Sequence, residues 1–199
     1  MLNVVLFGAG AIGQRYIEGL TALDIEMDLY VVDANKSVHE RVREISSGSE
    51  RRIKLHLFEN ENSSIFPNLI DIVVIATSSL ARGEIVKNIL NSYSVKYMVL
   101  EKFLFPYANT YKEIEALIQN NVKNIVVNTW MHLSEPLVSF IKKNMTLQNE
   151  ITVEGDGFGL GCNAVHFISL FDCLFEGELS LEGARVYEVY ESKRHGYYE

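Results

Sequence analysis

Cysteine and proline are scarce in this 199-residue sequence, which contains two cysteines and three prolines. Cys162 and Cys173 form neither a C-x-x-C pair nor a disulfide framework, so we expect both to be reduced, buried thiols. With no metal-ligand spacing among the cysteines, the sequence predicts no metal site.

Positive charge is also limited, because 18 Lys and Arg stand against 26 Asp and Glu, giving a formal net charge of -8. A nucleic-acid interface needs clustered Lys and Arg with a basic balance, so nucleic acid is not an expected partner. The apolar N-terminal run lacks a basic region and a cleavage-site spacer, and no run approaches the ~20 residues that span a bilayer. We therefore expect a soluble, cytoplasmic protein with no membrane partner.

Short apolar runs rich in Val and Ile recur along the chain as far as residue 129. Unbroken runs of this kind are typical of strands buried on both faces of a parallel sheet. Apolar residues at helical spacing lie between several of them, at 12–23, 85–90 and 107–118. The alternation predicts an α/β fold with a doubly wound parallel sheet covered by helices on both sides. The expected strands are 3–7, 28–32, 53–58, 71–77, 96–101 and 124–129.

Three glycines with the spacing G-x-G-x-x-G follow the first expected strand and open the first expected helix. In a dinucleotide-binding turn, Gly8 would permit the sharp bend, Gly10 would let the backbone approach a pyrophosphate, and Gly13 would allow close packing of helix on strand. Free N–H groups at the start of the helix, at Ala11 and Ile12, would face the phosphates. The sequence thus predicts a Rossmann domain. The alternative is a turn of small residues with no ligand.

Asp33 ends the second expected strand, about twenty residues after Gly13. A carboxylate at this point hydrogen-bonds an adenosine ribose 2′-hydroxyl and repels a 2′-phosphate. We therefore expect NAD as the cofactor, and Lys36, three residues further on, leaves NADP open as the alternative.

Four more segments, 75–90, 99–107, 127–143 and 159–174, occur in the order and spacing of the Gfo/Idh/MocA oxidoreductases, and nearly the whole chain resembles that family. These are NAD(P)-dependent dehydrogenases that act mostly on sugars, sugar nucleotides and cyclitols. The resemblance implies hydride transfer between a nicotinamide and a secondary hydroxyl of a sugar-like substrate. The residues expected to contact the cofactor are Gly8, Gly10, Ala11, Ile12, Gly13, Asp33, Ala76, Thr77, Glu101 and Lys102.

Glu101 and Lys102 look like the first two residues of the family's Glu-Lys-Pro motif, with Phe103 in place of the proline. The resemblance implies that Lys102 lies beside the nicotinamide and helps to bind or deprotonate the substrate hydroxyl. A lysine desolvated next to a cationic ring gives up its proton more readily, which suits this role. Arg82 and His132 stand where the family has a His and a basic residue, so we expect both near the same cleft. A solvated charge pair at a strand end is the alternative for Glu101 and Lys102.

Asn163 and His166 share one face of an expected helix. In the family this helix carries an Asp and, four residues later, a His or Tyr that serves in proton transfer; here Cys162 takes the place of the Asp. The resemblance implies that His166 acts with Lys102 as general acid or base and that Asn163 orients the substrate. A histidine packed in the core is the alternative.

We expect a dinucleotide-binding domain over 1–127 and a partial α+β substrate domain over 128–199. The second region carries expected helices at about 133–144 and around His166, and expected strands at 151–156 and 184–192. Two strands and two helices cover little of a sheet face, so we expect either a truncated chain or a homodimer formed through the C-terminal half. A non-catalytic NAD-binding protein is the main alternative to the dehydrogenase, and a nucleotide-sensing regulatory module is a weaker one.

Overall fold

The computed structural model describes residues 1–60, 66–145, 152–154, 159–175 and 180. The chain divides into two compact units, Met1–Asn128 and Thr129–Glu199.

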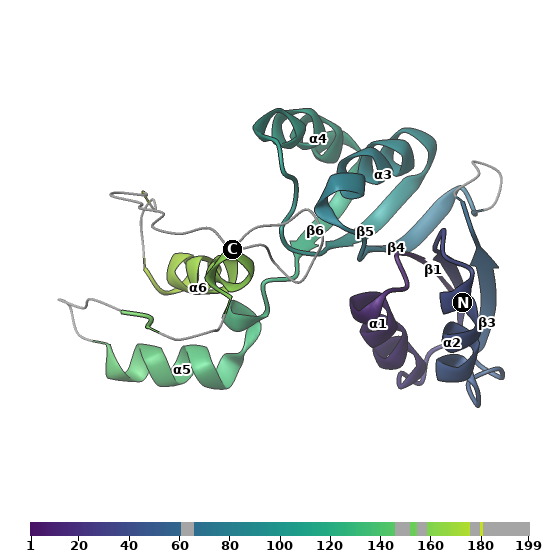
Figure 1. Cartoon of the computed structure of the whole chain (residues 1–199), viewed down its shortest axis with the longest axis horizontal. Coiled ribbons are helices and arrows are strands. Elements are labelled where there is room, and N and C mark those ends of the chain that lie inside the picture. The colour runs from purple at the N-terminus through teal and green to yellow at the C-terminus, as the bar shows by residue number, and fades with distance from the viewer. Residues whose placement is uncertain (61–65, 146–151, 155–158, 176–179, 181–199) are drawn as a thin grey trace. The chain divides into compact units, whose positions relative to one another are not determined.

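The first unit is built on a six-stranded parallel sheet with the order β3-β2-β1-β4-β5-β6 (Figure 1). Each expected strand is present, shifted by no more than two residues at either end, and the predicted Rossmann architecture is confirmed. The strands are β1 (Leu2–Phe7), β2 (Met27–Val32), β3 (Ile53–Phe58), β4 (Leu69–Ile75), β5 (Ser94–Leu100) and β6 (Val122–Val127).

Helices cover both faces of the sheet (Figure 1). They are α1 (Ala11–Thr21) and α2 (Ser37–Ser46) on one face, and α3 (Ser79–Ser92) and α4 (Ala108–Asn121) on the other. Val4 and Leu6 of β1 pack in the apolar cluster under α1 and α2, whereas Val5 and Phe7 pack in the cluster under α3 and α4. Because successive residues of the strand are buried on opposite faces, its sequence is an unbroken apolar run.

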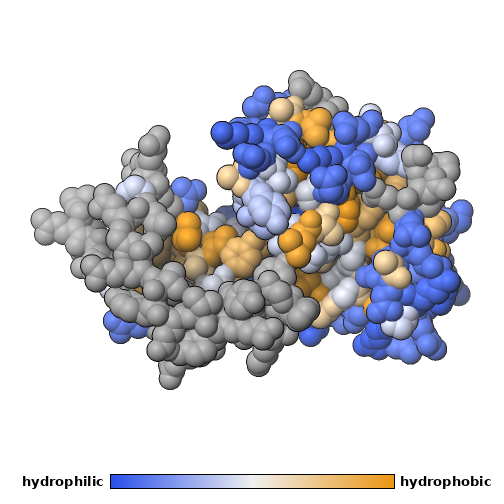
Figure 2. Space-filling view, turned by 45° about the horizontal axis from the view of Figure 1, so that its top comes forward, coloured by the Kyte–Doolittle hydropathy of each residue, from blue (hydrophilic) through white to orange (hydrophobic). Residues whose placement is uncertain are grey.

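The outward side of α3 and α4 is hydrophilic, as Figure 2 shows. Lys87 joins the two helices, since its Nζ lies 3.1 Å from Oε1 of Glu84 and 2.5 Å from Oε2 of Glu113. These helices therefore turn an apolar face to the sheet and a charged face to solvent.

Helix α2 is the element that apolar spacing did not indicate. Its buried residues are His39, Val42 and Ser46, so two of the three are polar and the apolar stripe is broken. Pattern analysis based on hydrophobic residues passes over such a helix.

The carboxyl ends of all six strands meet at one edge of the sheet, which we call the carboxyl edge. Backbone hydrogen bonds continue past the strand ends there: Ala76 N–H donates to the Phe7 carbonyl (2.8 Å), and Glu101 N–H donates to the Ile75 carbonyl (3.2 Å). Asn128 N–H likewise donates to the carbonyl of Leu100 at the end of β5 (2.8 Å). The strand order reverses between β1 and β4, and ligands of open α/β sheets bind at such a reversal.

The regular elements described in the second unit are helices. It contains a 3-10 turn (Trp130–Leu133), α5 (Glu135–Asn144) and α6 (Leu160–Leu174), and the last two match the expected helices. Residues 152–154, the described part of the strand expected at 151–156, are not in a strand. The strand expected at 184–192 lies outside the described residues. Among the described helices of either unit, none is long and apolar enough to cross a membrane.

Arg82 of α3 is enclosed by the loops of the first unit and is only 2% exposed. Its Nη1 donates to the carbonyl oxygens of Phe103 and Leu104, and its Nη2 donates to the carbonyl oxygen of Thr77. One guanidinium therefore joins the segment after β4 to the segment after β5. Arg82 is bound by backbone carbonyl groups. Its expected position near the cleft stays a prediction.

Replacing Arg82 by Met should lower the free energy of unfolding by about 3 kcal/mol, because buried carbonyl oxygens would lose charged donors. Urea unfolding followed by circular dichroism measures the change. Arg41→Met is the matched control on α2, where an exposed ion pair with Glu44 (2.8 Å) should contribute less than about 1 kcal/mol. Equal effects of the two substitutions would contradict the role given to Arg82.

Candidate functional site

The glycine turn between β1 and α1 is shaped by close contacts at two of its three glycines. Gly8 has a φ of +86°, and a Cβ there would lie 2.9 Å from the backbone nitrogen of Thr77. A Cβ on Gly13 would lie 1.9 Å from the carbonyl oxygen of Gly8. Any larger residue at either position would displace backbone, so both glycines are required for the turn itself.

Gly10 differs from the other two, because a Cβ on it would meet no atom within 4 Å. It is the N-cap residue of α1, and it has no side chain that would accept hydrogen bonds from the first turn of the helix. Ala11 and Ile12 follow as exposed residues of that turn. The N–H groups at the start of α1 are thus open to an anion, as the sequence predicts.

Asp33 fastens the end of β2 to this turn. Its Oδ2 accepts a hydrogen bond from Ala9 N–H at 2.7 Å, and its Oδ1 accepts one from Asn35 N–H at 2.8 Å. Two backbone donors fix the orientation of the carboxylate, and each of its oxygens retains a further lone pair for a ligand hydroxyl.

A cavity of about 330 Å³ opens beside Asp33 at the carboxyl edge. This volume lies within the range of small-molecule pockets. The hydroxyl oxygen Oγ1 of Thr77, a lining residue, is buried without a hydrogen-bond partner among the described residues. The cavity is lined by the ends of β1 and β2, the residues after β3, and the start of α3: Phe7, Gly8, Val32, Asp33, Ala34, Glu59, Asn60, Thr77, Ala81 and Ile85.

Glu101 is 7% exposed and belongs to a hydrogen-bonded cluster with Tyr16 and Asn128, which we call the Glu101 cluster. Tyr16 Oη donates to Glu101 Oε1 at 2.7 Å. Asn128 Nδ2 lies 2.7 Å from the same carboxylate oxygen and 2.9 Å from Tyr16 Oη, and donates to both. Three elements, α1, β5 and β6, thereby hold one carboxylate at the carboxyl edge.

Tyr16 and Asn128 were not among the predicted site residues. Nothing local in the sequence marks them as partners: Tyr16 follows the polar residues Gln14 and Arg15, and Asn128 comes directly after β6. Their partner is distant in sequence, since Glu101 lies 85 residues from Tyr16 and 27 from Asn128.

Lys102 follows Glu101 and is partly buried, with its Nζ 5.7 Å from the centre of the Phe103 ring. The Lys102–Phe103 peptide bond is cis. Arg82 binds the carbonyl oxygens of Phe103 and Leu104, as described above, so the loop that carries Lys102 is fastened at the two residues after it.

The remaining predicted catalytic residues, Asn163 and His166, lie on α6 in the second unit. His166 is 5% exposed, and the centre of its ring lies 6.0 Å from that of Trp130. Asn163 is partly buried on the same helix. Lys102 belongs to the first unit and these two residues to the second, so their joint action stays a prediction.

His132, also in the second unit, lies among hydroxyl groups. Its Nδ1 is 3.2 Å from Thr129 Oγ1 and 3.0 Å from Ser169 Oγ, which are 2.9 Å from one another. This network links the 3-10 turn to α6. Cys162 is partly buried, whereas Cys173 is exposed, so the prediction of two buried thiols is wrong for Cys173.

Comparison with known proteins relates the chain to dehydrogenases by fold. No protein-family model matches the chain, and no curated protein matches it. Among solved structures, the WlbA dehydrogenase of Thermus thermophilus, in complex with NAD and alpha-ketoglutarate, is 16% identical with a TM-score of 0.65, over 95% of this chain and 68% of that one. The myo-inositol 2-dehydrogenase of Lactobacillus plantarum is 17% identical with a TM-score of 0.55, over 71% of this chain and 40% of that one.

A transcriptional regulator, Gal80p of Kluyveromyces lactis, shares the fold as well, at 15% identity and a TM-score of 0.51, over 70% of this chain and 36% of that one. At these identities the likeness shows the fold alone. This chain spans well under half the length of the myo-inositol 2-dehydrogenase.

The contribution of the Glu101 cluster to stability should change at alkaline pH. Burial, and then the hydrogen bond to Glu101, raise the pKa of Tyr16 above that of an unfolded tyrosine. Its stabilising contribution is therefore complete below pH ~10 and is lost as the pH rises further. Tyr16→Phe should cost about 1 kcal/mol at pH 7, and its deficit against the unmodified protein should shrink above pH ~10.

Urea unfolding at a series of pH values measures this difference. Tyr107→Phe is the control, because Tyr107 is 66% exposed and should show no such trend. A deficit for Tyr16→Phe that stays constant across the alkaline range would show that the hydroxyl is not held neutral by the cluster.

Proposed function

We propose that the chain is an NAD-dependent dehydrogenase of the Gfo/Idh/MocA type, which transfers hydride between nicotinamide and a secondary hydroxyl of a sugar, sugar nucleotide or cyclitol. The observation that carries the proposal is the glycine turn. At Gly8 and Gly13, backbone atoms occupy the space that a Cβ atom would need, whereas at Gly10 this space is open, at the N-terminus of α1. That arrangement serves the approach of a pyrophosphate and adds nothing to packing.

The other residues of the carboxyl edge suit the rest of a dinucleotide. Asp33, oriented by two backbone N–H groups, would accept a hydrogen bond from the adenosine ribose. The cavity of about 330 Å³ would take the adenosine, and the buried Thr77 hydroxyl would gain a partner there. NAD(H) is thus the proposed cofactor.

Nicotinamide, when bound, supplies the hydride acceptor or donor. Lys102 would hold or remove the proton of the substrate hydroxyl, and Arg82 would keep the loop of Lys102 in place. Two hydrogen bonds of the Glu101 cluster hold Glu101, the residue before Lys102, and a third joins their donors, Tyr16 and Asn128. His166 and Asn163 would complete proton transfer and substrate orientation from the second unit, as the resemblance implies.

A non-catalytic dinucleotide-binding protein is the second candidate. It is favoured by Cys162 in place of the family's Asp, by the burial of His166 next to Trp130, and by the fold shared with a transcriptional regulator. Such a protein would bind NAD(H) at the same turn without turnover.

Gly10→Ala should weaken NADH binding at least about tenfold, because the added methyl group would occupy the space through which the pyrophosphate approaches. The matched control is Gly19→Ala on the same helix, where a Cβ also meets nothing within 4 Å. Fluorescence titration with NADH measures both, and urea unfolding checks that both variants fold. Equal affinity of the two variants would exclude this turn as the cofactor site.

Lys102→Ala should reduce turnover by about two orders of magnitude while leaving the NADH dissociation constant nearly unchanged. His166→Ala should do the same. A panel of sugars, sugar nucleotides and cyclitols, with NADH absorbance as the readout, provides the assay. Binding of NADH without oxidation of any member of the panel would favour the non-catalytic candidate.

A further inference from the structure

The cavity beside Asp33 has mainly apolar walls and a few polar lining residues. Val32 and Ala34 line it from the β2 segment, and Ala81 and Ile85, which are four residues apart and so share one face of α3, line it from that helix. An apolar lining favours a flat ring such as a purine, and the few polar groups of such a cavity fix its orientation and specificity.

Glu59 and Asn60, directly after β3, are polar residues that line the same cavity. Asp33 N–H donates to the Phe58 carbonyl at 3.0 Å, so the chain that leads into Glu59 is fastened to the residue proposed to hold the adenosine ribose. A base attached to that ribose would share the cavity with these two side chains.

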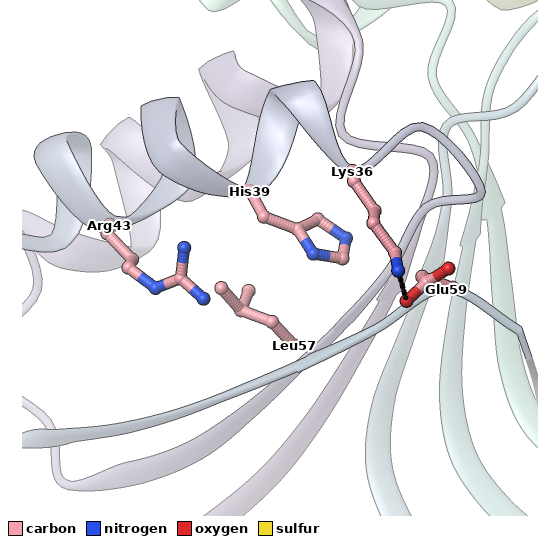
Figure 3. A pocket seen from close by; sticks show the side chains of 5 residues that line it. All are labelled: Lys36, His39, Arg43, Leu57 and Glu59. Carbon is pink, nitrogen blue, oxygen red and sulfur yellow. Dashed lines mark ion pairs between the residues drawn. The ribbon is translucent and has the colours of Figure 1, made fainter.

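The carboxylate of Glu59 is held from outside this cavity. Lys36 Nζ lies 2.8 Å from Glu59 Oε1, as Figure 3 shows. Figure 3 looks into a neighbouring cavity of about 350 Å³ between α2 and β3, which Glu59 also lines. The Glu59 side chain thus borders both cavities, and while Oε1 is bound to Lys36, Oε2 is left to accept a hydrogen bond from a ligand.

We propose that Glu59 and Asn60 recognise the amino group of adenine, so that the site selects an adenine dinucleotide against one that carries hypoxanthine. This inference rests on the proposed function, because it concerns the base of the same NAD(H). The adenine amino group donates hydrogen bonds, and a carboxylate only accepts them. Hypoxanthine has a carbonyl oxygen in place of the amino group, so two acceptors would face one another at Glu59.

Asn60 adds affinity and leaves the direction of the selection to Glu59. An amide binds two adjacent groups of an adenine edge, since it donates to a ring nitrogen and accepts from the amino group. The same amide can turn round and serve hypoxanthine, whereas Glu59 has no proton to donate. The Glu59 side chain is 46% exposed, so water competes with the base and the selection is about tenfold.

The test compares the dissociation constants of NADH and of reduced nicotinamide hypoxanthine dinucleotide, both followed by nicotinamide fluorescence. The unmodified protein should favour NADH about tenfold, and Glu59→Gln only about twofold, because a glutamine amide donates to the hypoxanthine carbonyl. Lys36→Gln should give an intermediate ratio, since the carboxylate of Glu59 loses the partner that orients it. Asn60→Ala should weaken the binding of both dinucleotides about threefold and leave their ratio unchanged.

Glu44→Gln is the matched control, because it breaks an ion pair of the same length, 2.8 Å from Arg41, between residues that do not line the cavity. Its ratio should equal that of the unmodified protein. Each ratio comes from one preparation, so a loss of folded protein in a variant does not change it.

Equal affinity of the unmodified protein for the two dinucleotides would overturn this inference and leave the proposed function standing. A ratio in Glu59→Gln as high as in Glu44→Gln would overturn it as well, and an unchanged NADH affinity in Asn60→Ala would remove that residue from the site. A protein that binds neither dinucleotide would refute the proposed function, and this inference with it.

Discussion

The guanidinium of Arg82 holds the carboxyl edge of the sheet together. Where β4 and β5 end, their backbones leave the ladder, and the carbonyl groups of the following residues need new donors. Arg82 supplies them for Thr77 on one side and for Phe103 and Leu104 on the other. The loop that contains Lys102 thus depends on one buried cation of α3.

A second set of contacts fixes the turn at β1, and these contacts are steric. A Cβ atom on Gly13 would collide with the carbonyl oxygen of Gly8, and one on Gly8 would collide with the backbone of Thr77. The carboxylate of Asp33 binds Ala9 N–H in the same turn. The ends of β1, β2 and β4 are therefore locked to one another before any ligand is considered. The space at Gly10 is open although the rest of the turn is tightly packed, which makes it a place for a ligand.

The strands and the turn could be predicted from sequence because each leaves a local signal. A strand buried on both faces is an apolar run, and the glycine spacing is contained in six residues. Helix α2 left no such signal, because His39 and Ser46 occupy its buried face. The Glu101 cluster left none either, since its members come together only when α1, β5 and β6 are packed. The contacts of Arg82 could not be predicted either, because sequence shows the charge of a residue but not the carbonyl groups that enclose it.

The second unit was predicted less well. Its two helices were foreseen, but residues 152–154 do not form the expected strand, and the exposure of Cys173 was not anticipated. Isolated apolar spacing indicates a helix, yet it does not say which of its polar residues face a partner element. Apolar spacing therefore did not predict that His166 lies next to Trp130, or that His132 contacts two hydroxyl groups.

A crystal structure of the protein grown with NADH would locate the cofactor. We expect pyrophosphate density against the backbone of Gly10, Ala11 and Ile12, with the adenosine ribose on the carboxylate of Asp33. Density for the dinucleotide at any other place, or a glycine turn that stays empty at saturating NADH, would contradict this expectation.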